Sequence, residues 1–449
     1  MQFHLKQLQF NLSRISHSPM ARRIASGTLW SILGKGIGKG STFVSMVLIA
    51  RILGKEAFGD FGLIKSTAVT FVTFSAFGVG LTATKYIAEF LHSDKERVGR
   101  IVGLSYFFTF FSSLVVASAF WLAVPWLCVS VLQSPHLVGL MRLGAVLLFL
   151  ATFYESQHGV LTGFQDFRGH ALSSIMAGLT MLPIYVTGAY YWGLPGAVTG
   201  AVIAIGLSVA INSVFIYHNM KRYAIRYRFL QAVQEWEVLG QFSFPIVLKA
   251  VVWGVSFWGC QMMLGAQQGG SAQLGIFYAA MVIYTVIIAV PQACARLYIA
   301  TLSEMLGKGD LKRLRKTIFL SFSINMAAAT AIALPFLFFP SLLMTWCFGE
   351  PFREGSSTLV LVSLAAILHT VGEVVDQIMV STEKCWTNCG YTIAGAATTL
   401  LAAFWIIPIW GSIGLALALL SGNCVRLSCF AAMWPRLNWP WDHLSDADS

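Results

Sequence analysis

The feature that most constrains this chain is a series of long apolar runs. Stretches of about 20 mostly apolar residues, such as 101–124 and 411–432, are separated by short polar segments. No water satisfies backbone N–H and C=O groups inside a bilayer, so apolar segments of this length cross it as helices. Because 57% of the residues are hydrophobic and only 11% are charged, the chain has too few charges for a soluble surface. The sequence therefore predicts an all-α polytopic membrane protein.

Hydropathy in windows of about 19 residues predicts about 12 transmembrane helices in two sets of six. The first set lies near residues 28–49, 61–83, 101–124, 138–160, 171–190 and 194–217. The second set lies near residues 240–264, 275–298, 318–346, 357–380, 388–409 and 411–432. An even number of crossings returns the chain to its starting side, so we expect both termini on the same side of the membrane.

Basic residues are distributed unequally between the two sides that these spans define. Most Lys and Arg residues fall in short loops on the side of the N-terminus, whereas only Arg51, Lys55 and Arg353 fall in loops on the other side. Membrane proteins retain positive charge on the cytoplasmic side. We therefore expect both termini in the cytoplasm, and the formal net charge of +11 reflects this bias rather than binding of nucleic acid.

The two sets of spans form an internal repeat with an offset of roughly 212 to 219 residues. Gly59 corresponds to Gly275, and Gly193 corresponds to Gly411. Six spans per half make the repeat parallel, and such a plan predicts a central cavity between two six-helix bundles. The predicted segments are a cytoplasmic N-terminal segment (1–25), an N-terminal bundle (26–217), a basic cytoplasmic linker (218–237), a C-terminal bundle (238–433) and a cytoplasmic tail (434–449).

Three lysines lie deep within the predicted spans. Lys35 and Lys39 are four residues apart on one face of the first span, on the order of 10 Å and 16 Å from its cytoplasmic end. Lys249 follows Lys35 by the repeat offset, in the first span of the second half. A charge at such depth is costly unless it faces water or a partner. The three lysines therefore predict either a cationic cavity for a phosphate-bearing substrate or structural ion pairs.

Glycines alternate with other residues around these lysines, at Gly34, Gly36, Gly38 and Gly40. Each glycine weakens a helix by about 1 kcal/mol, so this stretch predicts a bend in the first span. The alternative is close packing against a neighbouring helix. The stretch is not a phosphate-binding loop, because it lacks the Walker spacing.

Acidic residues recur at the repeat offset as well. Glu155 corresponds to Glu373, and His158 corresponds to Asp376, each pair being 218 residues apart. Carboxylates inside a membrane need partners, and Arg426 in the last predicted span is a candidate. These five residues predict either a cytoplasmic gate of ion pairs or a site at which H+ or Na+ is coupled to transport. By contrast, Lys65, Arg142 and Lys384 lie close enough to predicted span ends to reach the interface.

Motifs of other function classes are absent from the sequence. It contains no Walker motif, no nucleophile elbow and no His-Glu-x-x-His motif. Cys385 and Cys389 have no histidine or second cysteine pair nearby that would complete a metal site. We therefore expect a transporter that is not an enzyme and carries no metal or cofactor.

Short motifs near the N-terminus then suggest a family. Arg51-Ile52-Leu53-Gly54, Phe58-Gly59 and Gly78-Val79-Gly80 precede Lys85-Tyr86-Ile87-Ala88-Glu89, and a charged loop follows at Leu306 to Asp310. In these motifs and in its span pattern, the chain resembles the polysaccharide flippases of the Wzx type. That family shares a superfamily with the multidrug and toxin extrusion (MATE) transporters and the lipid II flippases, so the resemblance implies their fold.

The resemblance implies a function and a setting. A Wzx-type flippase moves an undecaprenyl-diphosphate-linked oligosaccharide from the cytoplasmic to the periplasmic leaflet by alternating access, for surface polysaccharides such as the O-antigen of lipopolysaccharide. The implied location is the bacterial inner membrane. The implied partners are this lipid-linked sugar, membrane lipids and, as candidates, a polysaccharide polymerase and glycosyltransferases. Two alternatives remain open: a cation-coupled exporter of drugs or metabolites in the same superfamily, and a scaffold of a polysaccharide assembly complex.

Overall fold

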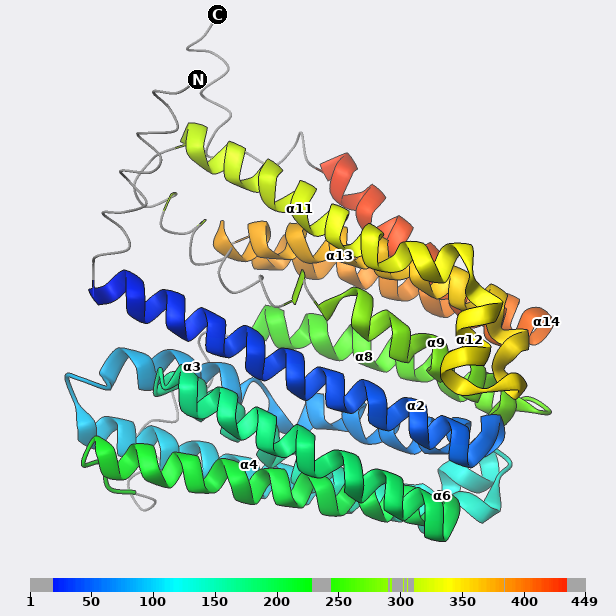
Figure 1. The fold of residues 1–449 in the computed structure, drawn as a ribbon, viewed down its shortest axis with the longest axis horizontal. Coiled ribbons are helices and arrows are strands. Elements are labelled where there is room, and N and C mark those ends of the chain that lie inside the picture. Colours follow the sequence, from blue (N-terminus) through cyan, green and yellow to red (C-terminus); the bar gives the residue numbers. More distant parts are fainter. Residues whose placement is uncertain are drawn as a thin grey trace, which may run out of the picture.

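The computed structural model describes residues 19–227, 244–289, 291–292, 302, 305, 311–382 and 384–433. Nearly all of these residues are helical (Figure 1). The α-helices are α2 (Pro19–Ala76), α3 (Val79–Phe90), α4 (Lys95–Trp126), α5 (Val138–Gly163), α6 (Phe167–Arg222), α8 (Phe244–Gly265), α9 (Gly270–Ile287), α11 (Leu311–Phe338), α12 (Pro340–Phe348), α13 (Ser356–Ser381) and α14 (Cys385–Met433). Short helical turns of other types cover Leu127–Val131, Pro135–Leu137 and Glu350–Gly355.

Three of these helices turn back on themselves at a glycine. The backbone is non-helical at Gly54 in α2, Gly193 in α6 and Gly411 in α14, and φ is positive at all three. Glycine adopts positive φ without steric cost. In α6 the turn brings Asn219 back to Asp166, whose carboxylate accepts a 3.2 Å hydrogen bond from the amide. The repeat-related positions Gly193 and Gly411 therefore separate the last two segments of each half, as predicted.

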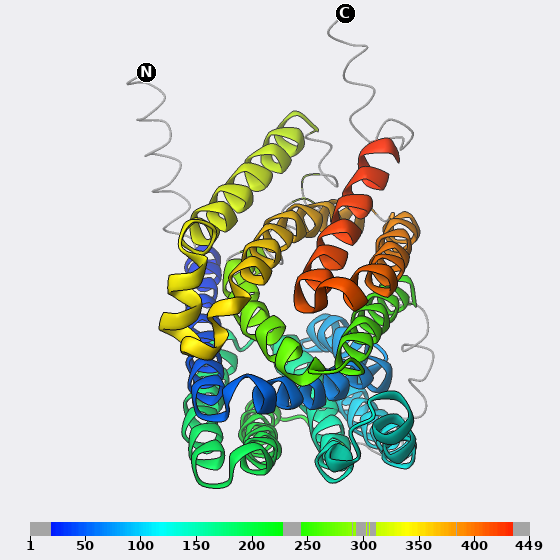
Figure 2. The same ribbon diagram turned by 90° about the vertical axis from the view of Figure 1, so that its right-hand side faces the viewer.

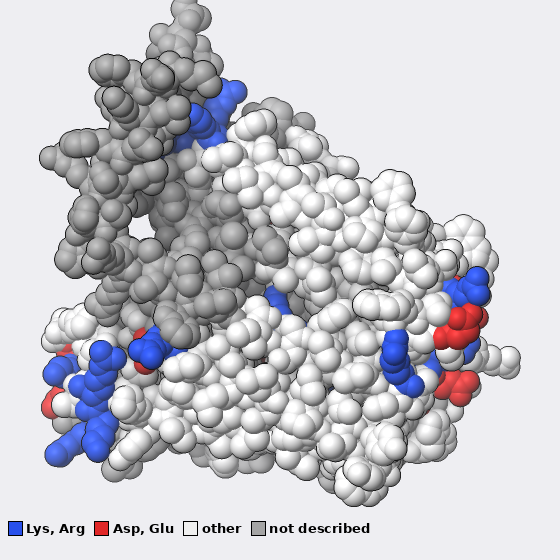
Figure 3. All heavy atoms as spheres, viewed as in Figure 1, with Lys and Arg blue, Asp and Glu red and all other residues white. Residues whose placement is uncertain are grey.

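The described residues include nine helices that are long and apolar enough to cross a membrane. Charged side chains gather at the two ends of the molecule in Figure 3, with a largely uncharged band between them. The chain is therefore a multi-pass membrane protein. Three of the nine helices contain the glycine turns, and the count of twelve crossings stays a prediction.

Two predicted spans are interrupted, which corrects the hydropathy assignment. The span predicted at 61–83 ends with α2 at Ala76, because Phe77 and Gly78 both have positive φ before α3 begins. The span predicted at 318–346 is divided between α11 and α12 at Pro340. The sequence stays apolar across both breaks, so a hydropathy window cannot detect where the helices end.

The helices form two groups, which we call the first group (α2–α6) and the second group (α8–α14) (Figure 2). Helix α2 lies between them, in contact with α6 of the first group and with α8 and α9 of the second. The division into two six-helix bundles stays a prediction. Of the predicted segments, residues 1–18, the linker residues 228–237 and the tail 434–449 lie outside the described residues, as does the loop at 306–310.

The two groups meet through a reciprocal backbone contact that follows the repeat. A Cβ atom on Gly59 would clash with the carbonyl oxygen of Ser271, and one on Gly275 would clash with the carbonyl oxygen of Lys55. Lys55 and Ser271 are 216 residues apart, as are Gly59 and Gly275. Equivalent helices therefore touch through equivalent positions, which is the pattern of a two-fold related contact.

Side chains reinforce this contact at the end of the molecule that includes Gly54. Lys55 forms an ion pair with Glu354, Arg51 donates hydrogen bonds to the backbone carbonyls of Trp346 and Cys347, and Asp60 accepts a 2.6 Å hydrogen bond from Ser271. We call these contacts the Gly54-end closure. It contains two of the three basic residues predicted to lie outside.

Replacing Gly59 with alanine is expected to destabilise the protein by about 2 kcal/mol, because the new methyl group meets backbone that cannot rotate away. The matched control is Gly40→Ala. Gly40 is a helical glycine of α2, and a Cβ atom on it would meet no atom within 4 Å beyond its own helical turn, so alanine there should stabilise the helix by up to about 1 kcal/mol. Thermal unfolding of both variants in detergent tests this, and equal melting temperatures would contradict it.

Candidate functional site

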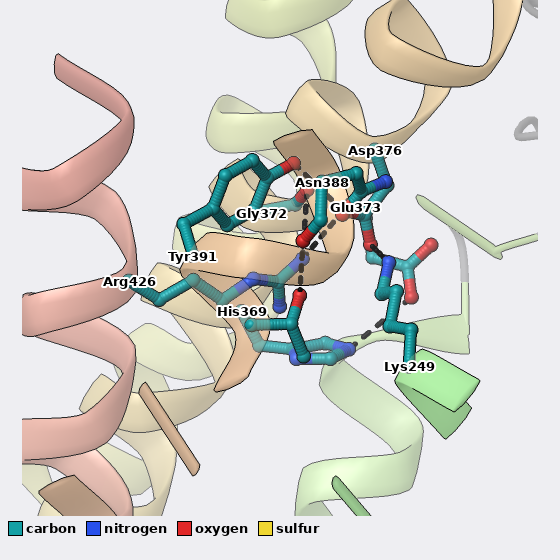
Figure 4. A network of polar contacts seen from close by, with 9 residues as sticks. Lys249, His369, Gly372, Glu373, Asp376, Asn388, Tyr391 and Arg426 are labelled. Atoms are coloured by element: carbon teal, nitrogen blue, oxygen red, sulfur yellow. Dashed lines mark hydrogen bonds and ion pairs between the residues drawn. The ribbon is translucent and has the colours of Figure 1, made fainter. Parts of the chain in front are cut away.

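The site is centred on Asp376 of α13, which is the hub of a charged network in the second group (Figure 4). Its Oδ2 lies 2.5 Å from Nζ of Lys249 on α8, and its Oδ1 lies 2.7 Å from Nη2 of Arg426 on α14. The hydroxyl of Tyr391 donates a 3.3 Å hydrogen bond to Oδ1. One carboxylate thus joins three helices, and its charge is compensated by two cations.

Arg426 is held in place by small residues around it. Its side chain is only 5% exposed. Nη2 also donates to the carbonyl oxygen of Gly372, at 3.4 Å. A Cβ atom on Gly372 would lie 3.1 Å from Nη1, and one on Gly395 would lie 3.0 Å from the Cβ atom of Arg426. These two glycines therefore leave the space that the buried guanidinium needs.

Glu373 extends the network along α13. Its Oε1 lies 3.2 Å from Nε2 of His369, one helical turn away. His369, Glu373 and Asp376 follow the i, i+4, i+7 spacing that places side chains on one helix face. Two basic residues (Lys249, Arg426) and two carboxylates (Glu373, Asp376) give the network a net charge of zero when His369 is neutral.

Lys39 lies opposite this network, where α2 faces the second group. Its Nζ donates a 2.9 Å hydrogen bond to Oε1 of Gln292, which is a neutral acceptor. Glu373 attracts it electrostatically without forming an ion pair within 4.0 Å. Figure 3 shows a Lys or Arg side chain in a recess near the middle of the molecule, next to uncharged surface. Lys39 is therefore a partly uncompensated cation that bridges the groups.

The structure thus gives different environments to the lysines of the predicted cationic set, which are Lys35, Lys39 and Lys249. Lys249 has the ion pair that the alternative interpretation predicted, and Lys39 has a neutral partner. The side chain of Lys35 lies outside the described residues. The role of each lysine in substrate binding stays a prediction.

The glycines around Lys39 pack closely and do not bend the helix. Residues 34–40 are helical throughout, and the only non-helical residue within α2 is Gly54. A Cβ atom on Gly34 would press on Ala171, and one on Gly38 would lie 3.3 Å from the carbonyl oxygen of Ser174. The predicted bend is therefore wrong, and close packing against α6 explains two of the four glycines.

Glu155 and His158 lie in the first group, on α5. His158 Nδ1 lies 3.0 Å from Nε2 of His170, and its Nε2 lies 3.2 Å from the hydroxyl of Tyr154. Glu155 is exposed. Arg426 accompanies Asp376, as expected for a partner of the repeat-related acidic residues. Whether any of these residues forms a gate or a coupling site stays a prediction.

Sequence reasoning missed four residues of the site region: His369, Tyr391, Gln292 and Lys65. His369 could have been found from its spacing to Glu373 and Asp376. Lys65 was placed near a span end, yet it lies eleven residues beyond Gly54 within a continuous helix, which is about 16 Å along the axis. That expectation is wrong, because the helix begins before residue 61. Tyr391 and Gln292 have no signal in the sequence that separates them from other intramembrane polar residues.

Comparison with known proteins gives this arrangement a context. Residues 24–293, more than half of the chain, match the family described as polysaccharide biosynthesis protein. The EPS I polysaccharide export inner membrane protein EpsE of Ralstonia solanacearum is 22% identical over 408 residues, covering 88% of this chain and 90% of that protein. The lipid III flippase of Escherichia coli (strain K12) is 20% identical over 409 residues, covering 90% of this chain and 96% of that protein.

Solved structures of transporters and flippases share the fold of this chain. An inward-facing multidrug resistance MATE family transporter of the MOP superfamily superposes with a TM-score of 0.73 at 15% identity, covering 90% of this chain and 98% of that chain. The lipid II flippase MurJ in an inward closed conformation gives a TM-score of 0.69 at 12% identity, covering 91% and 87%. The predicted MATE/flippase fold is confirmed. The named relatives are an export protein and flippases, which confirms that the chain is not an enzyme. Because the family match covers more than half of the sequence, the chain belongs to the polysaccharide biosynthesis protein family.

Proposed function

We propose that this protein flips a polyprenyl-diphosphate-linked oligosaccharide from the cytoplasmic to the periplasmic leaflet by alternating access. The observation that carries the proposal is Lys39, a cation between the two groups whose hydrogen-bond partner, Gln292, carries no charge. A diphosphate needs cationic partners to leave water. The names of the relatives, a polysaccharide export protein and a lipid III flippase, support a lipid-linked sugar as the ligand.

The arrangement of the two groups supports alternating access. The Gly54-end closure holds them together at one end, through Lys55, Glu354 and the reciprocal glycine contact. Away from that end, Figure 3 shows a small recess near the middle of the molecule. Rocking of two halves about a site between them is how repeat-built transporters alternate. The proposed cycle therefore opens the Gly54-end closure after the ligand has entered from the opposite side.

The proposal also covers the location of the protein, its partners and its energy source. The name of EpsE and the loop charges support the inner membrane, with both termini in the cytoplasm. Membrane lipids surround the protein, and a polysaccharide polymerase and glycosyltransferases are candidate partners. The energy source in this proposal is a gradient of H+ or Na+, with Glu373 as its candidate carboxylate because Asp376 already pairs with two cations.

The same pairing disfavours export of organic cations, the alternative function. An exporter of cations needs unpaired carboxylates or aromatic faces near the ligand. Within the network, Asp376 pairs with Lys249 and Arg426, and Glu373 contacts His369. The network therefore offers a cation little uncompensated negative charge.

A leaflet-resolved transport assay tests the proposed function. Purified protein is reconstituted into vesicles that contain a fluorescent polyprenyl-diphosphate-linked oligosaccharide, and a membrane-impermeant quencher or lectin reports the accessible leaflet. We expect the protected fraction to become accessible with the protein and to stay protected in protein-free vesicles. Export of a small organic cation without movement of the lipid would contradict the proposal and favour the alternative.

A further inference from the structure

Lys65 is a second deep cation on α2, outside the network around Asp376. It lies in the segment of α2 that follows Gly54, with ten residues between that turn and Lys65 and eleven more from there to the end of α2 at Ala76. The side chain is part-buried, and Nζ donates a 3.9 Å hydrogen bond to Sδ of Met46. A thioether is a weak acceptor. Lys65 therefore occupies the middle of a membrane-spanning segment with almost no stabilising partner.

The other deep cations of the described residues are partnered. Lys249 and Arg426 share Asp376, and Lys39 bonds with Gln292. For Lys65, in contrast, no carboxylate of the described chain lies within 4.0 Å. An intramembrane charge without a partner is expensive and marks a functional position by default. This contrast separates Lys65 from Lys249 and Arg426, whose charges Asp376 compensates, and from Lys39, which has a neutral hydrogen-bond partner.

The position of Lys65 continues the face of α2 that carries Lys39. Lys39, Thr42 and Met46 are spaced i, i+3 and i+7, so they lie along one side of the helix. Seven residues of helix separate Lys39 from Met46, which is about 10 Å. Because Lys65 contacts Met46, it lies at the end of this row nearer to Gly54. The two ammonium groups thus stand in sequence along the direction of transport.

Residues next to Lys65 hold the two groups together. The hydroxyl of Ser66 lies 2.7 Å from that of Tyr278, which donates a 2.6 Å hydrogen bond to Gln261. The indole of Trp258 donates a 3.0 Å hydrogen bond to Thr67. These contacts cross from α2 to α8 and α9, and they must break if the closure opens. An anion at Lys65 would lie beside them.

We propose that Lys65 is a second anion-binding station, to which the diphosphate of the lipid-linked substrate moves from Lys39 before the Gly54-end closure opens. This inference rests on the proposed function and names the path of the charged group within it. Lys39 receives the anion on entry. Lys65 receives it at the deeper end of the row, where the arriving negative charge compensates an otherwise unpartnered ammonium group.

The test compares Lys65→Met with Lys39→Met in two measurements. Binding of farnesyl diphosphate to the purified protein reports the first station, with farnesol as the uncharged control. Lys39→Met should weaken this binding by about tenfold or more, whereas Lys65→Met should weaken it by a smaller factor. In the leaflet-resolved assay, Lys65→Met should slow translocation by at least about tenfold, and Lys65→Arg should retain most of it.

Thermal unfolding separates this role from a structural one. Removing an unpartnered charge from a membrane interior should raise the melting temperature of Lys65→Met above wild type, whereas loss of a structural residue would lower it. Lys221→Met, at an exposed position near the end of α6, controls for loss of a lysine and should behave as wild type.

Three outcomes decide the inference. Slow translocation by a Lys65→Met protein that is more heat-stable and still binds the probe supports it. Wild-type translocation by Lys65→Met, or equal loss of probe binding in both variants, overturns it while leaving the proposed function intact. A wild-type protein that moves no lipid-linked sugar overturns the proposed function and this inference together.

Discussion

Replacing Lys39 with alanine is expected to slow translocation of a lipid-diphosphate-linked oligosaccharide severely while leaving the fold intact. Lys39 bonds only with a neutral amide among the described residues, so its loss leaves no buried carboxylate without a partner. A hydrogen bond to a charged group contributes about 1.5–3 kcal/mol. Its loss from the ligand complex should therefore reduce transport by at least about tenfold. The leaflet-resolved assay gives the rate, and the melting temperature verifies the fold.

Two further variants show whether the charge of Lys39 or its shape is required. Lys39→Arg keeps the positive charge and should retain transport. Gln292→Ala removes the neutral acceptor and leaves the ammonium group free for a ligand, so this variant should also transport. Transport at the wild-type rate by Lys39→Ala would contradict the cationic-cavity hypothesis. Loss of transport in Gln292→Ala as well as in Lys39→Ala would instead indicate that the hydrogen bond between the two groups is required.

Much of the fold could be predicted from the sequence because its signals are local. Long apolar runs indicate membrane helices, and the turns at Gly193 and Gly411 follow from repeat-related glycines between apolar segments. The break at Gly78 was missed, since φ at Phe77 and Gly78 depends on the local backbone and not on apolarity. Hydropathy also misplaced Lys65. It set the start of the span at residue 61, after the true start of the helix, so a lysine deep in the helix was predicted to lie near the interface.

The sequence could predict which residues belong to the candidate site, but not which of them contact one another. Charges inside predicted spans are rare, so Lys249, Asp376 and Arg426 stand out in the sequence. Their pairing follows from how α8, α13 and α14 pack, and no spacing within one helix reveals it. The repeat offset placed Lys249 opposite Lys35, whereas its ammonium group pairs with Asp376 of its own group. Internal repeats therefore predict equivalent positions better than they predict partners.

Replacing Asp376 with asparagine is expected to destabilise the protein by about 3 kcal/mol, because it leaves a buried guanidinium and a part-buried ammonium group without their shared counter-charge. Asparagine keeps the volume of the side chain and can still accept a hydrogen bond from Tyr391, so the change tests charge rather than packing. Chemical or thermal unfolding in detergent measures the loss. Glu373→Gln is the matched control, since the direct partner of Glu373 is His369, and it should cost less.

A second substitution should restore part of this loss, and its position decides how much. Arg426 is 5% exposed, whereas Lys249 is 22% exposed, so the uncompensated guanidinium is the more costly of the two cations. We therefore expect Asp376→Asn with Arg426→Gln to be more stable than Asp376→Asn alone, and Lys249→Met to rescue less. A double-mutant cycle gives the coupling energy of each pair. Equal stability of wild type and Asp376→Asn would show that the network contributes nothing to folding, and it would return Asp376 to the candidates for ion coupling.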